Sequence, residues 1–495
     1  MKNVTKVFGS VVANKNVNLS VKKGEVHALL GENGAGKSTL MNCLYGMFDS
    51  FEGEVYFDDK PTKIKDPKQA ISLGIGMVHQ HFMLIPALTV IENVVLGLKE
   101  NKSVLDLKAA AKEFTELGKR YNMEIDPWVK VEQLSVGQQQ RLEILKALYR
   151  KVKLLILDEP TAVLTPGEIE SLFDMMKQLS SEGHTVIFIT HKLGEVMKIC
   201  DRCTVLRLGE VVETLDIDMV QDTKHLAALM VGRDVEFETK LKAPERKEQN
   251  LKIENLNVNN DRDLPAVKDI SFEVYGGEIL GICGVDGNGQ TELIQCITGL
   301  RKAVSGKITI NNVESTNLDA RKILALKVSH IPEDRHKYGM VGSMALDENL
   351  ILVSYKQENY SSKGFLNSKW IAEKSKEIIK NFNVKTPGVK ELAKNLSGGN
   401  QQKLVVGREL DRDPDLLIAV HPSRGLDIGA TKYIQQQIVA QRDKGAAVLM
   451  VSTELDELIE LSDRILVIYE GEIMGIVDRE NASREVLGPL MAGMR

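Results

Sequence analysis

Apolar residues occur along the chain in two kinds of run, one typical of buried strands and the other of amphipathic helices. Residues 26–30 and 154–157 are short and apolar except for His27, as expected for strands buried on both faces of a parallel sheet. Residues 165–168 combine a capping box with proline at the first helical position and so predict a helix start. The helix should end at Gly183, and a strand over residues 185–190 follows. One face of this helix is apolar: Ile169, Leu172, Phe173, Met176 and Leu179. Alternating strands and helices predict an α/β fold.

The same order of patterns occurs twice in the chain. Residues 17–59 align without gaps on residues 270–312, an offset of 253 (270 less 17). From Leu134 and Leu396 onwards the offset is 262, so nine residues are inserted in the second copy before these points. An internal repeat of this length indicates two copies of one domain.

The repeat predicts a domain over residues 1–235 and a second domain over residues 251–495. The stretch between them, residues 236–250, holds eight charged residues in fifteen and one proline. Such a composition is typical of a solvated linker.

Composition and charge exclude several classes of protein. The net charge is −5 without a basic block, which argues against a nucleic-acid partner. No uninterrupted apolar run reaches the roughly 18 residues of a membrane span, and the N-terminus lacks a signal-peptide pattern. Five cysteines suit a reducing compartment. The pair Cys200 and Cys203 resembles half a zinc or redox site, but the second copy has Ser462 and Ile465 there, so we interpret the cysteines as structural. A cytoplasmic protein is expected.

Residues 31–38 read Gly-Glu-Asn-Gly-Ala-Gly-Lys-Ser, a P-loop between a predicted strand and a helix. Its glycines let successive backbone N–H groups turn toward phosphates, and the helix N-terminus adds its dipole. Lys37 is expected to reach the β- and γ-phosphates of ATP, and Ser38 to bind Mg²⁺. The residues assigned to the nucleotide in this loop are Gly31, Asn33, Gly34, Gly36, Lys37, Ser38 and Thr39.

Two adjacent carboxylates follow the apolar strand over residues 154–157. Asp158 suits an outer position at Mg²⁺, and Glu159 is placed to polarise an attacking water. A strand-end acidic pair is more often the start of a solvated loop, but its place downstream of a P-loop favours catalysis. His191 stands at the end of the strand over residues 185–190, where open α/β sheets carry ligand chemistry.

Residues 134–138 (Leu-Ser-Val-Gly-Gln) and 396–400 (Leu-Ser-Gly-Gly-Asn) resemble the signature motif of ABC ATPases. With Gln80 and His191 in the expected order, the resemblance covers nearly the whole chain. It implies two tandem P-loop NTPase domains, each with a RecA-like core and a helical signature subdomain. In that family each ATP lies between one P-loop and the signature of the other domain, so the two halves should pair within the chain.

The resemblance also implies roles for single residues. Gln80 is expected at Mg²⁺ and in coupling to membrane subunits, and His191 at the γ-phosphate. Phe8 is expected to stack on adenine, with a core aromatic as the equally weighted alternative. The second copy should contribute the remaining contacts: Ser397, Gly398, Gly399 and Asp427.

The second copy lacks the catalytic groups of the first. Across the repeat, Thr291 keeps a hydroxyl and Gly284, Gly287 and Gly289 keep the loop, but five functional residues are replaced. These are Lys37 by Gln290, Gln80 by Glu333, Asp158 by Val420, Glu159 by His421 and His191 by Thr453. Without a general base or a metal carboxylate, this second site is predicted not to hydrolyse ATP. The sequence leaves open whether it still binds a nucleotide.

Tandem chains with a degenerate second half resemble the ATP-binding subunits of bacterial simple-sugar and nucleoside importers. Residues 78–86 and 331–335 are most similar to the nucleoside branch. The resemblance implies two transmembrane permease subunits, a substrate-binding lipoprotein outside the cell, and a peripheral position on the cytoplasmic face of the membrane.

Two other classes share the superfamily. Soluble tandem ABC ATPases that act on ribosomes also have two halves and no membrane span, but they usually have a long charged linker and two complete sites. DNA-repair and chromosome ATPases insert zinc modules or long coiled coils, and neither pattern occurs in this sequence.

Overall fold

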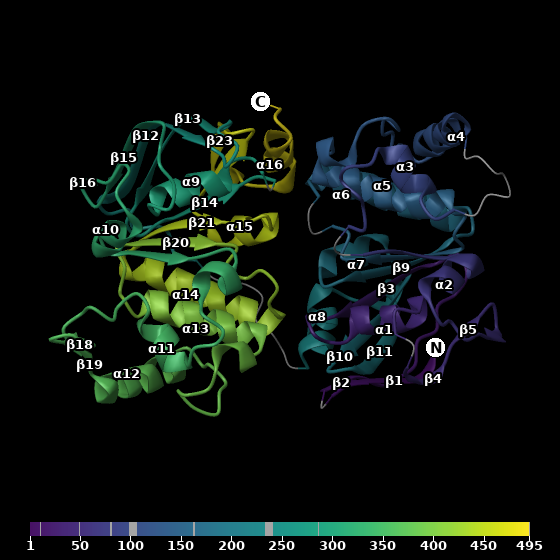
Figure 1. Cartoon of the computed structure of the whole chain (residues 1–495), viewed down its shortest axis with the longest axis horizontal. Helices are drawn as coiled ribbons and strands as arrows, with labels where there is room; N and C mark the ends of the chain where they lie inside the picture. The colour runs from purple at the N-terminus through teal and green to yellow at the C-terminus, as the bar shows by residue number, and fades with distance from the viewer. Residues whose placement is uncertain are drawn as a thin grey trace. The chain divides into compact units, whose positions relative to one another are not determined.

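The apolar runs of the sequence form one six-stranded sheet in each half of the chain (Figure 1). A computed structural model describes residues 1–9, 11–48, 50–79, 82–98, 106–161, 164–232, 241–285 and 287–494. The chain divides into two units, Met1–Val235 and Glu236–Arg495. Both units combine a largely parallel sheet with helices, which confirms the α/β prediction.

In the first unit the main sheet has the strand order β11-β10-β3-β9-β8-β7. All neighbours are parallel except β10 and β11, so the carboxyl ends of β3, β8 and β9 meet at one edge. The strands are β3 Val26–Gly31, β7 Ile75–Val78, β8 Leu154–Asp158, β9 Thr185–Thr190, β10 Arg202–Arg207 and β11 Glu210–Asp216. A smaller antiparallel sheet has the order β2-β1-β4: β1 Lys2–Phe8, β2 Val11–Val17 and β4 Glu52–Glu54. The ribbon β5 Tyr56–Phe57 and β6 Lys60–Pro61 pairs separately.

The helices of the first unit are α1 Lys37–Tyr45, α2 Pro67–Leu73, α3 Val90–Val95, α4 Leu107–Arg120, α5 Val136–Tyr149, α6 Pro166–Ser181, α7 Leu193–Ile199 and α8 Thr223–Val231. The predicted start of α6 is confirmed, because Thr165 and Glu168 form the expected capping box. The helix ends at Ser181, just before Gly183, whose φ is 88°.

The second unit repeats this architecture with the sheet order β17-β20-β21-β14-β22-β23. Its strands are β12 Gln249–Asn259, β13 Pro265–Tyr275, β14 Ile279–Cys283, β15 Ser305–Ile310, β16 Val313–Glu314, β17 Val328–Ile331, β18 Ser361–Ser362, β19 Phe365–Leu366, β20 Leu416–Val420, β21 Ala447–Val451, β22 Arg464–Tyr469 and β23 Glu472–Asp478. Its helices are α9 Gln290–Ile297, α10 Ala320–Ala325, α11 Leu346–Ile351, α12 Ser368–Asn381, α13 Gly398–Leu410, α14 Ile428–Lys444, α15 Leu455–Leu461 and α16 Arg484–Met491.

Alternate residues of β20 enter two different apolar cores. Leu416 and Ile418 pack into one, and Leu417 and Ala419 into the other. The strand is apolar throughout because both faces of the sheet are covered. A third core joins α11, α12 and the start of α13 into a helical part, which corresponds to the expected signature subdomain.

The nine extra residues of the second unit lie at three places. Equivalent elements of the two units differ in residue number by an offset that grows along the chain. The offset is 253 between β7 and β17, 256 between α3 and α11, 261 between α4 and α12, and 262 between the short helices Val131–Gln133 and Ala393–Asn395. Three extra residues therefore precede α11, five lie between α11 and α12, and one follows α12. The first place contains a π-helical turn over Arg335–Gly339, and the second contains the β18–β19 hairpin.

Residues 242–248, which lie in the expected linker, are exposed, and the stretch also makes contacts with the rest of the second unit. The buried Arg442 donates a hydrogen bond to the carbonyl of Lys242 (3.3 Å), and Arg246 pairs with the buried Glu278 (2.8 Å). The strand β12 already begins at Gln249. The stretch is thus tied to the second unit by the Arg246 side chain and the Lys242 carbonyl, which composition alone does not reveal.

Over the described part of the chain, no helix combines the length and apolar character needed to cross a membrane. The five cysteines are all buried and free of disulfides. Burial raises the pKa of Cys203 to about 11 and that of Cys200 well above its usual value, so both remain protonated thiols in the core.

Candidate nucleotide-binding site

The P-loop of the first unit connects β3 to α1 in a conformation that only glycine adopts easily. Gly34 and Gly36 have φ values of 83° and 96°, in the left-handed region. A Cβ on Gly36 would clash with the carbonyl of Ala13, whereas one on Gly34 would meet nothing within 4 Å. Asn14 donates to the carbonyl of Gly36 (3.1 Å) and holds the loop against β2. The loop thus exposes Asn33 and Ser38 and partly exposes Thr39 at the start of α1.

Lys37 lies buried within the loop. Its Nζ donates to the carbonyls of Gly31 (2.6 Å) and Glu32 (3.0 Å). Burial lowers the pKa of Lys37, and the neighbouring carboxylates of Glu159 and Asp158 oppose that shift. The structure therefore places the ammonium beside both predicted acidic groups.

Asp158 ends β8 and accepts a hydrogen bond from the hydroxyl of Ser38. Burial is the main cause that raises the pKa of Asp158, and the bond from Ser38 opposes it. A hydroxyl and a carboxylate are oxygen donors of the kind that Mg²⁺ prefers, so this pair fits the predicted metal position.

Glu159 and His191 meet because β8 and β9 are neighbours in the sheet. The two side chains are 3.0 Å apart, from His191 Nδ1 to Glu159 Oε1. Glu159 has a φ of 48°, and its N–H donates to the carbonyl of Ile189. Burial favours a higher pKa for Glu159, but the hydrogen bond from His191 and the charges of His191 and Lys37 outweigh it and lower the pKa. The carboxylate is thus held in its ionised form.

Phe8 lies at the end of β1 and is 43% exposed, so it is not a core residue. Its ring meets Phe48 edge to face, with centroids 5.2 Å apart, and Lys6 Nζ lies 5.1 Å from the Phe8 centroid. An exposed, supported ring of this kind can stack on a base. Gln80, the remaining predicted residue of this site, lies outside the described residues.

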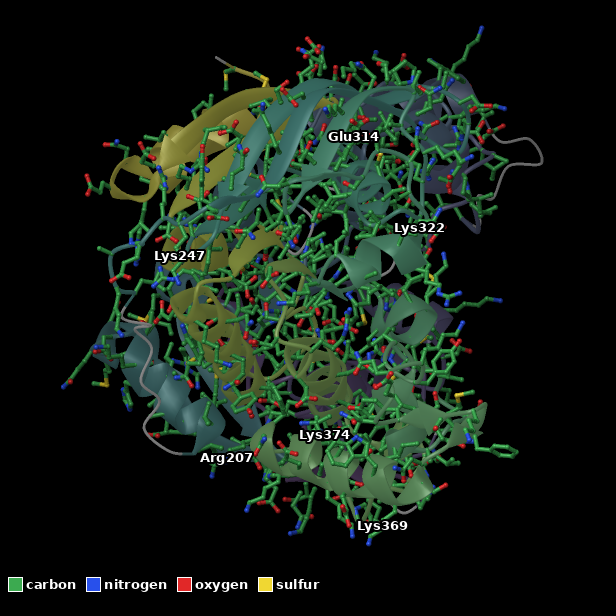
Figure 2. The ribbon with its side chains drawn as sticks, turned by 90° about the vertical axis from the view of Figure 1, so that its left-hand side faces the viewer. Arg207, Lys247, Glu314, Lys322, Lys369 and Lys374 are labelled. Carbon is green, nitrogen blue, oxygen red and sulfur yellow. The ribbon has the colours of Figure 1, made fainter. Side chains whose placement is uncertain are left out.

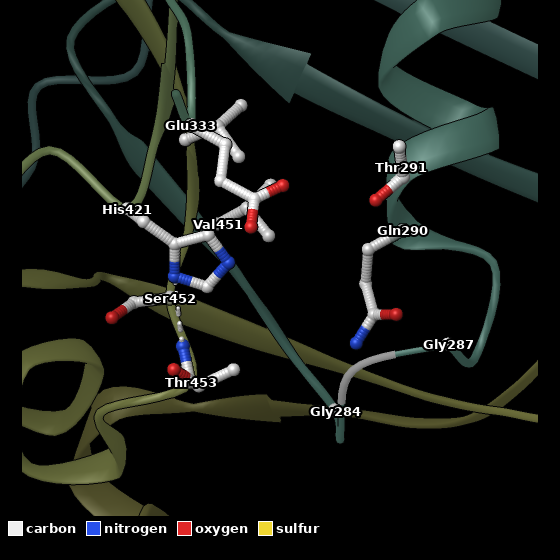
Figure 3. A pocket seen from close by; sticks show the side chains of 10 residues that line it. Gly284, Gly287, Gln290, Thr291, Glu333, His421, Val451, Ser452 and Thr453 are labelled. Atoms are coloured by element: carbon white, nitrogen blue, oxygen red, sulfur yellow. Dashed lines mark hydrogen bonds between the residues drawn. The ribbon is translucent and has the colours of Figure 1, made fainter. Parts of the chain in front are cut away.

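The equivalent pocket of the second unit, of about 180 Å³, lacks these groups (Figure 3). The amide of Gln290 donates to the carbonyl of Val285 (3.2 Å). His421, with a φ of 44°, accepts at Nδ1 from the N–H of Thr453 (3.4 Å). Glu333 pairs with Arg424 (2.7 Å). Among the ten described residues that line this pocket, none is a lysine or arginine.

The two signature motifs begin helices that face opposite charges. In the first unit, Ser135 caps α5 and the Glu168 carboxylate lies directly against Gly137. In the second unit, the Arg335 guanidinium lies against Gly398, 2.9 Å from the position a Cβ would take there.

The other residues predicted from the second signature lie around the start of α13. Ser397 precedes α13, and its hydroxyl accepts a bond from Asn400 (2.8 Å). Asp427 caps α14, and its Oδ2 lies 3.5 Å from the Cβ position of Gly399. The structure therefore brings Ser397, Gly399 and Asp427 together.

Arg335 was not identified from the sequence, because its place depends on the π-helical turn that follows β17. Burial lowers the pKa of Arg335, and Asp334 opposes that shift. Its Nε lies 3.5 Å from Oε1 of Gln401 in α13. A half-buried guanidinium at the start of a helix creates a position that favours an anion.

A family model described as ABC transporter matches residues 14–162 and 267–423, more than half of the chain. The chain is 50% identical over 494 residues to the nucleoside import ATP-binding protein NupA of Lactococcus lactis subsp. cremoris, covering 100% of this chain and 97% of that protein. It is 50% identical over 495 residues to the guanosine import ATP-binding protein NupO of Bacillus subtilis, with the same coverage. An archaeal ribosome recycling factor, solved in complex with a ribosomal stalk protein, shares the fold at a TM-score of 0.65 and 19% identity, over 98% of this chain and 92% of that one. The chain belongs to the ABC transporter family, as an ATP-hydrolysing subunit with two tandem ATP-binding domains.

Proposed function

We propose that this subunit hydrolyses ATP at one site to drive import of a nucleoside through partner permeases. Import and the nucleoside class are supported by the 50% identity, over the whole chain, to two nucleoside import proteins. Simple sugars are the second candidate substrate class, because the tandem architecture resembles their importers as well. The likeness to a ribosome recycling factor is one of fold alone and does not favour a ribosomal role.

The observation that carries the single-site mechanism is the Glu159–His191 hydrogen bond beside Lys37 and Asp158. Glu159 stays ionised and can accept a proton from the attacking water as general base. Lys37 would turn from the loop carbonyls to the β- and γ-phosphates when ATP is bound. His191 would position the carboxylate and contact the γ-phosphate.

Ser38 and Asp158, together with Gln80, are proposed to hold Mg²⁺. When bound, the ion neutralises charge on the phosphate oxygens. Phe8 is proposed to stack on adenine. Residues 397–399 and Asp427 of the second unit are proposed to complete the contacts to this ATP, with Arg335 adding positive charge.

The second unit is proposed to support the first rather than to hydrolyse ATP. His421 stands where a general base would be needed, and its Nδ1 already accepts a backbone N–H. A neutral Gln290 replaces the lysine that would bind phosphates.

We further propose two transmembrane permeases as direct partners, a substrate-binding lipoprotein as an indirect one, and a peripheral position on the cytoplasmic face of the membrane. These assignments follow from the importer class. Uptake of labelled guanosine and of labelled ribose by cells with and without the gene would separate the two substrate classes. Loss of guanosine uptake alone supports the nucleoside assignment, and loss of ribose uptake alone rejects it.

The mechanism is tested by steady-state ATPase activity of the subunit with its permeases. We expect Glu159→Gln to reduce turnover by about 10²-fold or more, because it removes the general base. His421→Gln is the matched control at the same position of the repeat and should change turnover less than about twofold. Equal losses in the two variants would show that the second unit is catalytic and would refute the single-site mechanism.

A further inference from the structure

The second unit carries a short hairpin between α11 and α12, within the stretch that is five residues longer than in the first unit (Figure 1). Its strands β18 and β19 pair antiparallel, with Ser362 opposite Phe365. Lys363 and Gly364 make the turn, with φ values of 49° and 85°. Positive φ at both turn residues gives the tight reversal that matches the twist of paired strands.

The base of the hairpin is anchored to the helical part of the unit. Tyr360 is buried and packs with Ile351 of α11 and Ile371 of α12. The N–H of Asn367 donates to the carbonyl of Tyr360 (2.9 Å), and the side chain of Asn367 caps α12 by accepting from the N–H of Trp370 (3.2 Å). The tip is therefore presented in a defined conformation.

The hairpin and the start of α12 that follows it expose large apolar side chains to solvent. Phe365 is 80% exposed, Leu366 54% and Trp370 40%. Phe365 and Leu366 lie on β19 and Trp370 lies in the first turn of α12, so three large apolar side chains are exposed within six residues of the chain. Their exposure disfavours the isolated state and favours contact with a partner.

The charge around the tip is positive. Lys356, Lys363 and Lys369 are exposed, and none of the three forms an ion pair with a described residue. By contrast Lys374, which lies further along α12 than Lys369 (Figure 2), is neutralised by Asp411 (2.9 Å) and Glu377 (3.3 Å). The only acid between residues 355 and 370 is Glu358.

This combination distinguishes a membrane surface from a protein partner. Protein interfaces are enriched in arginine and depleted in lysine, yet residues 352–370 contain three lysines and no arginine. Tryptophan and other aromatic residues with lysines are typical of groups that sit at the headgroup level of a bilayer. Lysines near the surface are attracted to anionic lipids.

We propose that the β18–β19 hairpin and the start of α12 bind the surface of an anionic phospholipid bilayer, with Phe365 and Trp370 entering the headgroup region and Lys363 and Lys369 pairing with lipid phosphates. This contact goes beyond ATP hydrolysis and does not depend on it. It would give the second unit a direct hold on the membrane besides any contact with permeases.

The test is flotation of the purified full-length chain, without permeases, with vesicles of phosphatidylcholine alone or with phosphatidylglycerol added. Wild type should float only with the anionic vesicles, and less at high salt. The pair Phe365→Ser and Trp370→Ser, and separately the pair Lys363→Glu and Lys369→Glu, should each weaken binding by roughly tenfold or more.

Matched controls are Leu208→Ser, at an 87% exposed leucine of the first unit, and the pair Lys22→Glu and Lys23→Glu at exposed lysines there. Both controls should bind as wild type does. Failure of wild type to bind anionic vesicles, or equal binding by the hairpin variants, would overturn the proposal. The ATPase activity of the hairpin variants should be unchanged. An unchanged activity shows that the variants still fold and that only lipid binding is lost.

Discussion

His191 Nδ1 lies 3.0 Å from Glu159 Oε1, and this pair has no counterpart in the second unit, where His421 accepts from the backbone of Thr453 instead. The two units share strands, turns and positive φ at the residue after the strand, 48° at Glu159 and 44° at His421. The strand-end backbone is therefore kept at this point of the repeat, while the side chains predicted to carry the chemistry differ.

The first prediction concerns His191→Ala. Without the hydrogen bond and charge of His191, burial would dominate and the pKa of Glu159 would rise. Because a general base acts only when ionised, activity is lost as pH falls through its pKa. The acid limb of the kcat/KM profile should therefore move to higher pH, in addition to a lower maximum. His191→Gln, which can still donate a hydrogen bond, should shift the limb less; an unmoved limb in both variants would contradict the role of His191.

The second prediction concerns the exposed ring of Phe8. Stacking of a base on an aromatic side chain is worth about 1–3 kcal/mol, so Phe8→Ala should raise the KM for ATP roughly tenfold while kcat changes little. Phe8→Trp should keep a low KM. Titration of ATPase activity with ATP measures both, with Phe365→Ala as a control at another exposed phenylalanine. An unchanged KM in Phe8→Ala would exclude stacking.

A third prediction uses the opposite charges at the two signature helices. If Arg335 holds a phosphate, Arg335→Gln should reduce ATP turnover about tenfold, since charge-assisted bonds to phosphate are strong. Arg335→Lys should recover part of the loss because it restores charge without the fork geometry. Glu168→Gln, the matched change in the first unit, should leave turnover nearly unchanged. Equal changes of ATP turnover in Arg335→Gln and Glu168→Gln would contradict the role assigned to Arg335.

The fourth prediction concerns the buried pair Arg442 and Asp463. Arg442 Nη1 lies 3.1 Å from Asp463 Oδ1, and Asp463 also accepts from the N–H of Ile279 (2.8 Å). Arg442→Met would leave a buried carboxylate without its cation and should lower the free energy of unfolding by about 3–5 kcal/mol. Adding Asp463→Asn should recover part of this loss. Urea denaturation of the full chain measures the series.

The loss of unfolding free energy caused by Arg442→Met should depend on pH in a defined direction. Burial raises the pKa of Asp463, so its contribution to stability is present below the ordinary carboxyl pKa and is lost as pH rises through the raised one. Without Arg442 the pKa would rise further, and the destabilisation should be smaller at pH 5 than at pH 8. A loss of equal size at both values would contradict this account.

The sequence by itself determined the α/β fold and the repeat and supplied the candidate residues of the first site, because these depend on local order. A strand, its terminal carboxylates and a P-loop occupy fixed places relative to one another along the chain, and the parallel sheet then brings Asp158, Glu159 and His191 to one edge. The same local order showed which groups the second copy lacks.

Only the tertiary structure decided where Arg335 lies, how residues 241–250 pack, and that Phe8 and the tip of the β18–β19 hairpin are exposed. Each depends on contacts between segments far apart in the sequence: Arg335 reaches Gly398, and Arg442 reaches Lys242. Charge and hydropathy along the chain predict what a residue prefers, whereas its burial and partners are set by which distant segment packs against it.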